Sequence, residues 1–186
     1  MRQLLFILLN LLIYNTGSSQ SIKIPYGKSA VMIDGKFNPA EWDDAIKVKL
    51  SDSLMLHFKQ DHHYIYWCLQ GMFQKPALRG VDFYITNNST MINLHTSAQL
   101  GERTFTNMSY GGWIWWNNDS WVATVSRPVT ASSFLADEAK EFQLHKSRFS
   151  NRSIRLMLSI AAPDILPAYP SDATTTSSLK WLLLDL

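Results

Sequence analysis

Trp113 and Trp115 are the residues whose type and spacing best suit ligand binding. Planar aromatic side chains offer a large contact area at a small entropic cost, and the C–H faces of sugar rings stack on them. Residues spaced i and i+2 along a strand share one face of a sheet. If this face points outward, the pair forms a platform for carbohydrate. If a loop or the N-terminal segment covers it, the pair belongs to the core.

Tyr64, Tyr66 and His57 form a second aromatic group on the outer face of a predicted hairpin. The two tyrosines are further candidates for carbohydrate binding. A short helix around Trp42 could equally cover this group, and its role would then be packing.

Metal and haem sites receive little support. Asp61-His62-His63 contains adjacent histidines, whose side chains point apart, whereas zinc needs three or four converging ligands. We expect a turn at these residues. Methionine and histidine leave haem ligation formally open, but the sequence has no Cys-x-x-Cys-His motif.

Catalysis by paired carboxylates would need two acids in one cleft. The adjacent pairs Asp43-Asp44 and Asp137-Glu138 are more typical of a solvated surface, and no nucleophile-elbow, zinc-protease or phosphate-loop motif occurs. We therefore expect no catalytic residue. An enzyme would gain support if Asp82 or Glu141 met a histidine in a pocket.

Alternating apolar and polar residues indicate the strands that position these candidates. The clearest predicted hairpin runs from Leu54 to Leu69, with Asp61-His62 at its turn and Leu56 opposite Trp67 on the core face.

A second hairpin is predicted from Trp113 to Thr124 around an Asn-Asn-Asp-Ser turn. It would direct Ile114, Trp116 and Trp121 toward the core. The pair Trp113 and Trp115 would then share the outer face.

The remaining pattern is also β-rich. A short helix is predicted at Asn38-Pro39-Ala40-Glu41, with an N-cap, a proline at N1 and an acid at N3. Many short strands with no crossover helix predict an all-β sandwich or barrel. The further strand candidates are Val81–Thr86, Phe142–His145, Ile154–Ile160 and Leu179–Leu184.

The N-terminal residues have the order of a secretory signal peptide: Arg2, an apolar run from Leu4 to Ile13, and a small-residue cleavage site ending at Ser19. The run is shorter than the roughly 20 apolar residues that span a membrane. We expect residues 1–19 to be removed, and residues 20–186 to form one secreted or periplasmic domain without a membrane span.

Composition narrows the partners. The 186-residue chain is 46% hydrophobic with a formal net charge of +2, which favours a folded domain and gives no electrostatic case for nucleic acid. Cys68 is the single cysteine, so no intrachain disulfide forms, and its place in an apolar strand indicates packing. The absence of disulfides and the short signal peptide favour a bacterial source.

The segment from Ile33-Asp34-Gly35 to Glu41-Trp42 resembles the opening of the family 9 carbohydrate-binding modules and their DOMON-like relatives. The resemblance extends over most of residues 31–186. It implies an antiparallel β-sandwich of immunoglobulin-like or jelly-roll type with one short N-terminal helix, without catalytic activity. Later stretches in the same order are Asp61–Leu69, Val81–Ile85, Glu141–Leu144, Arg155–Leu158 and Trp181–Leu184.

In these modules a sugar end lies between aromatic rings, and calcium can support the fold. The ligand-binding aromatics are not part of the matched motif, so the resemblance marks Asp34, Glu41 and Trp42 as structural residues only. It implies no cofactor, with structural calcium left open.

The expected partner is therefore an oligo- or polysaccharide bound at Trp113, Trp115, Tyr64 and Tyr66. The alternative is a protein-interaction or envelope structural module whose outer aromatics meet a protein. Polar groups beside the tryptophans would favour sugar, and a broad apolar patch would favour a protein partner.

Overall fold

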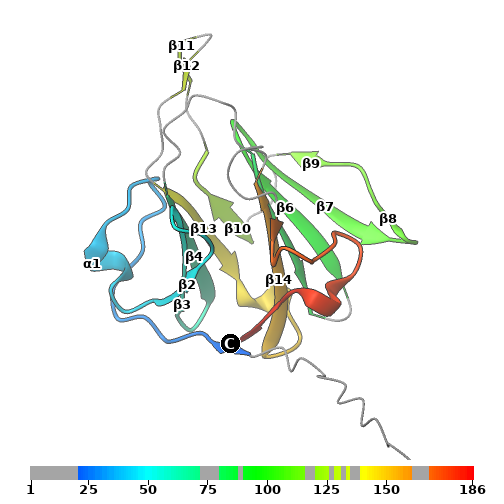
Figure 1. Cartoon of the computed structure of the whole chain (residues 1–186), viewed down its shortest axis with the longest axis horizontal. Helices are drawn as coiled ribbons and strands as arrows, with labels where there is room; N and C mark the ends of the chain where they lie inside the picture. Colours follow the sequence, from blue (N-terminus) through cyan, green and yellow to red (C-terminus); the bar gives the residue numbers. More distant parts are fainter. Residues whose placement is uncertain are drawn as a thin grey trace, which may run out of the picture.

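The chain folds into two β-sheets that pack face to face (Figure 1). The computed structural model describes residues 21–71, 80–87, 90–115, 120–125, 128–130, 133–134, 139–160 and 168–186. The large sheet has the order β1-β16-β14-β5-β6-β7-β8, with β15 beside β14 and β9 beside β7. Its strands are β1 (Ile22–Lys23), β5 (Val81–Thr86), β6 (Met91–Thr96), β7 (Leu100–Thr106), β8 (Ser109–Tyr110), β9 (Ile114–Trp115), β14 (Ser153–Ile160), β15 (Ala168–Tyr169) and β16 (Leu182–Asp185).

The small sheet has the order β10-β13-β4-β3-β2. Its strands are β2 (Ile46–Lys49), β3 (Leu54–Gln60), β4 (Tyr64–Gly71), β10 (Trp121–Ala123) and β13 (Ala139–His145). A third sheet pairs β11 (Pro128–Thr130) with β12 (Ser133–Phe134). The helices are α1 (Pro39–Trp42) and two 3₁₀ turns, η1 (Lys146–Arg148) and η2 (Ser178–Lys180).

This architecture confirms the predicted all-β sandwich with one short α-helix. Among the described strands, only β1 and β16 pair in parallel. The helix begins as predicted, because the Asn38 side chain caps it by accepting from the amide of Ala40. Within the described ranges, no helix has the length and apolar character needed to cross a membrane.

Aromatic side chains from both sheets join the two layers. Trp67 of β4 stacks on Phe142 of β13 with ring centroids 5.3 Å apart, and both rings contact Phe83 of β5. All three side chains are almost fully buried. Because each strand alternates, this packing decides which residues of β5 and its neighbours face outward.

The segment before β2 covers the outer face of the small sheet, where α1 lies in Figure 1. Glu141, fully buried on β13, holds it by accepting hydrogen bonds from the amides of Asp34 and Gly35 at 3.0 and 2.9 Å and from the Trp42 indole at 3.2 Å. Burial raises the pKa of Glu141, although these hydrogen bonds oppose the shift. Gly35 has a positive φ of 82°, which favours glycine there.

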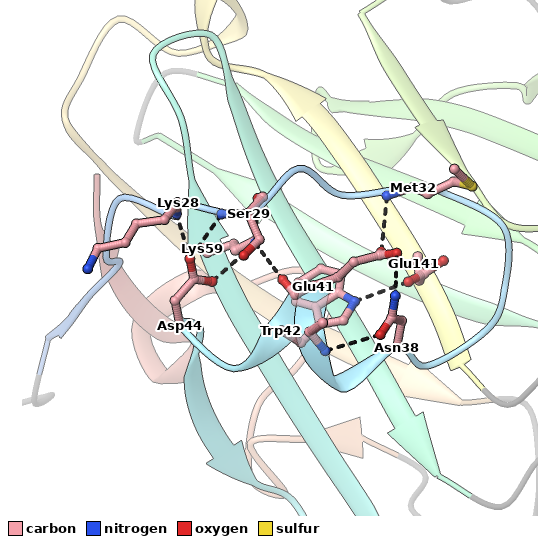
Figure 2. Close-up of polar contacts among 10 residues, drawn as sticks. Lys28, Ser29, Met32, Asn38, Glu41, Trp42, Asp44, Lys59 and Glu141 are labelled. Carbon is pink, nitrogen blue, oxygen red and sulfur yellow. Dashed lines mark hydrogen bonds and ion pairs between the residues drawn. The ribbon is translucent and has the colours of Figure 1, made fainter.

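A buried lysine on β3 holds the same segment (Figure 2). Lys59 donates to the backbone oxygens of Ser29 and Glu41 at 2.8 and 2.5 Å, and pairs with Asp44 at 3.1 Å. The predicted structural markers Asp34, Glu41 and Trp42 therefore all lie in a segment that two buried charges fasten to the sheet.

The predicted β3–β4 hairpin forms, but its predicted register is wrong by two residues. Leu56 lies opposite Leu69, and Phe58 lies opposite Trp67. The turn is as expected at residues 61–63, where the Asp61 carboxylate accepts from two following amides. A shift of two residues keeps every side chain on its face, so the predicted core face is right.

The predicted hairpin from Trp113 to Thr124 is wrong. Strand β9 instead pairs with β7 in the large sheet, whereas β10 pairs with β13 in the small sheet. Trp121 is buried as predicted, but Ile114 is 61% exposed. Trp116 lies outside the described residues, as does the predicted signal peptide.

Two further strand predictions have mixed outcomes. Strand β5 has both predicted bounds, Val81 and Thr86. The predicted strand from Leu179 is wrong at its start, because η2 occupies residues 178–180 and β16 begins only at Leu182.

Replacing the buried carboxylate should loosen the N-terminal segment. We expect Glu141→Ala to lower the free energy of unfolding by roughly 3 kcal/mol, because three donors lose their buried acceptor. Asp52→Ala removes an exposed carboxylate that pairs with Lys49, and it should change the free energy of unfolding by less than about 1 kcal/mol. Urea unfolding measures both variants, and equal effects would contradict this account.

Candidate functional site

Trp113 and Trp115 stack on the outer face of the large sheet. Their ring centroids are 5.2 Å apart and their planes are 25° from parallel. Trp115 lies opposite Gly101 of β7, and a Cβ on that glycine would lie 2.5 Å from the Trp115 ring and 3.1 Å from that of Trp113. Both indoles therefore rest on bare backbone, while Trp115 remains 40% exposed.

Arg103 extends this stack along β7. Its guanidinium carbon lies 4.3 Å from the centroid of the Trp113 ring and 4.6 Å from that of Tyr110. Its Nε donates to the Asn93 side chain at 2.8 Å. We call Trp113, Trp115, Arg103 and Tyr110 the tryptophan–arginine stack; the cation–π contacts hold its members in fixed positions.

A row of polar side chains lies beside the stack on β5, on β6 and just after β6. We call Asp82, Asn93, His95 and Ser97 the polar row. One carboxylate oxygen of Asp82 accepts from Asn93 and contacts Nδ1 of His95, both at 3.1 Å. The other ring nitrogen of His95 lies 2.9 Å from the Ser97 hydroxyl. The His95 ring also meets both indoles edge-on, at centroid distances of 5.5 and 6.1 Å. The row thus places hydrogen-bonding groups directly beside the aromatic rings.

The C-terminal segment closes the other side of the stack. Trp181 packs with Tyr84 and Met157 on the outer face, and Tyr110 donates its hydroxyl to the Thr175 backbone. Burial raises the pKa of Tyr84 and of Tyr110, against an opposing effect of Arg103 on each. Both phenols therefore stay neutral beside the arginine.

The structure places Tyr64 and Tyr66 on the outer face of the small sheet, away from the two tryptophans. Tyr66 packs beside Trp42 and donates to Asp61 at 2.7 Å. Tyr64 meets the ring of His145 edge-on at 5.0 Å. The four predicted binding residues thus form two separate groups. In the group on the small sheet, Tyr66 packs beneath the N-terminal segment.

Asp82 meets a histidine, which is the first part of the condition given above for an enzyme; the second part is a pocket around the pair. Asp82, His95 and Ser97 lie in a hydrogen-bonded chain in the same order, acid to histidine to serine, as the chain that activates the serine of many hydrolases. Both carboxylate oxygens of Glu141, in contrast, accept hydrogen bonds from the N-terminal segment. Among the described residues, no three histidine, cysteine, aspartate or glutamate side chains converge as a metal site would require.

Sequence reasoning missed Asn93, His95 and Arg103 as site residues. None of them belongs to a recognisable motif, and β6 and β7 were not among the predicted strands. Alternation offered a signal, because Ile92 and Leu94 bracket Asn93 and place it on the opposite face.

Adding a side chain beneath the indoles should separate them. We expect Gly101→Ala to displace Trp115 and to weaken the coupled near-ultraviolet circular dichroism of the stacked pair, with the far-ultraviolet spectrum unchanged. Gly112→Ala is the matched control, because its Cβ meets no atom within 4 Å. A Gly101→Ala spectrum identical to that of the wild type would show that the close contact is not needed.

Comparison with known proteins shows a similar fold in one solved structure. No family model and no curated protein matches the sequence. A crystal structure of a "putative carbohydrate-binding protein" from Bacteroides uniformis ATCC 8492 superposes with a TM-score of 0.52, at 7% sequence identity. The match covers 90% of this chain and 99% of that one. At this identity the likeness shows a shared fold, and carbohydrate binding is a description of the Bacteroides protein.

Proposed function

We propose that this chain is a non-catalytic module that binds a glycan on the outer face of its large sheet. The observation that carries the proposal is the stacked pair Trp113 and Trp115, seated on Gly101 with the polar row at its side. Sugar recognition combines such aromatic contact with nearby hydrogen-bonding groups. Polar neighbours beside the rings favour sugar over a protein partner, which usually meets a broader apolar patch.

The spacing of the rings determines how a sugar would bind. Two rings enclosing a pyranose need about 7–8 Å between them, twice an ordinary contact distance of 3.5–4.0 Å. Trp113 and Trp115 are 5.2 Å apart, so a sugar lies against the exposed side of the pair and not between its members. His95 then lies on the side where ring hydroxyls would be, and the buried Asn93 side chain holds Arg103 beside it.

The proposal extends to family and location. The resemblance of residues 31–186 to family 9 modules supports a family 9-like module. The fold shared with the Bacteroides protein supports only the coarser proposal of a carbohydrate-binding β-fold. The signal-peptide pattern supports secretion or a periplasmic location. Tyr64, partly exposed on the small sheet, stays a second candidate contact.

Glycan binding is tested by titration calorimetry of the purified chain against neutral and acidic oligosaccharides. We expect single-site dissociation constants between micromolar and millimolar, about −8 to −4 kcal/mol. Trp115→Ala should weaken binding at least about 10-fold, because it removes the exposed aromatic surface. Ile114→Ala is the matched control on the same strand, 61% exposed on the other face.

Two outcomes would contradict the site. Equal losses in Trp115→Ala and Ile114→Ala would exclude the tryptophan pair as the contact. No heat with any glycan from a folded chain would favour the alternative of a protein-interaction or envelope module.

A hydrolase is the second candidate, because Asp82, His95 and Ser97 form one hydrogen-bonded chain. A binding module should hydrolyse acetylated sugars and nitrophenyl acetate no faster than its Ser97→Ala variant. It should also resist labelling by a fluorophosphonate. Turnover that Ser97→Ala and His95→Ala both abolish would make this chain an esterase.

A further inference from the structure

Arg103 is the cation of the proposed site, and no anionic side chain of the described residues pairs with it. It is partly buried, its Nε is used by Asn93, and its guanidinium packs on Trp113 and Tyr110. Among the described residues, no carboxylate lies within 4.0 Å of it. A partly desolvated cation without a counter-charge is costly, and a ligand anion would relieve that cost.

Two other cations of the interior, Arg148 and Lys59, do pair with a carboxylate. Arg148 forms a two-pronged pair with Glu102 at 2.5 and 2.9 Å, and Lys59 pairs with Asp44. The acid nearest Arg103 in the polar row is Asp82, whose Oδ1 contacts Asn93 and His95. The phenols of Tyr84 and Tyr110 stay neutral and supply no charge.

We propose that the glycan site selects glycans carrying a carboxylate or a sulfate, with Arg103 binding the anionic group. This inference rests on the proposed function. The fixed fork of a guanidinium matches both groups, and its stacked position removes much of the entropy of holding it. The guanidinium lies 4.3 Å from the Trp113 ring, so a substituent of a sugar on the tryptophan pair is within its reach.

The test compares each acidic oligosaccharide with a neutral partner of the same backbone. Trigalacturonate and its methyl ester form the carboxylate pair, and a carrageenan oligosaccharide with its desulfated form provides the sulfate pair. Calorimetry is run on the wild type, Arg103→Met, Arg103→Lys and the control Arg152→Met, which replaces an exposed arginine just before β14. Arg103→Met keeps the apolar length of the side chain and removes its charge.

We expect at least one acidic ligand to bind about 10-fold or more tightly than its neutral partner, and added salt to reduce that preference. Within Arg103→Met, the acidic and neutral members of each pair should bind with equal affinity, whatever that affinity is; Arg103→Lys should restore part of the preference, and Arg152→Met should leave it unchanged. Equal binding of both members of each pair, or a preference that survives Arg103→Met, would overturn this inference and leave the glycan site intact. Absence of binding to all four ligands and to neutral oligosaccharides would overturn the glycan site itself.

Discussion

The site depends on the packing that fixes the register of β5, β6 and β7. Phe83 lies opposite Leu94, and both are buried between the sheets. Alternation then requires Asp82 and His95, the next pair, to face outward. A slip of one residue would bury these polar groups and expose the core, so the hydrophobic contacts set the position of every hydrogen bond in the row.

The two outer faces of the sandwich differ in whether their polar and charged side chains are covered by another segment of the chain. On the small sheet, Lys59 and Glu141 are buried, and the N-terminal segment satisfies both. On the large sheet, the C-terminal segment covers Tyr84 but leaves Trp115 exposed. The first arrangement is complete without a ligand. The second presents aromatic surface and polar groups to the solvent, as a recognition surface does.

Local patterns predicted the features that depend on neighbouring residues. The cap at Asn38 and the strand Val81–Thr86 follow from short-range rules, and the structure confirms them. Pairing partners depend on distant residues, so the Asn-rich stretch after β9 wrongly indicated a hairpin. Alternation also cannot distinguish registers two residues apart, which explains the error in β3–β4. The tryptophan pair was found by type and spacing, whereas Arg103 matched no motif.

The parallel pairing of β1 with β16 joins distant parts of the chain. Ile22 lies opposite Leu184, and the Ser21 hydroxyl donates to Asp185 at 2.6 Å across 164 positions. Contacts between such distant residues form late, because a long loop must first close. During synthesis from the N-terminal end, β1 therefore cannot pair with β16 until β16 has been made. The edge of the large sheet, although formed by the first strand described, is thus completed only after β16 is present.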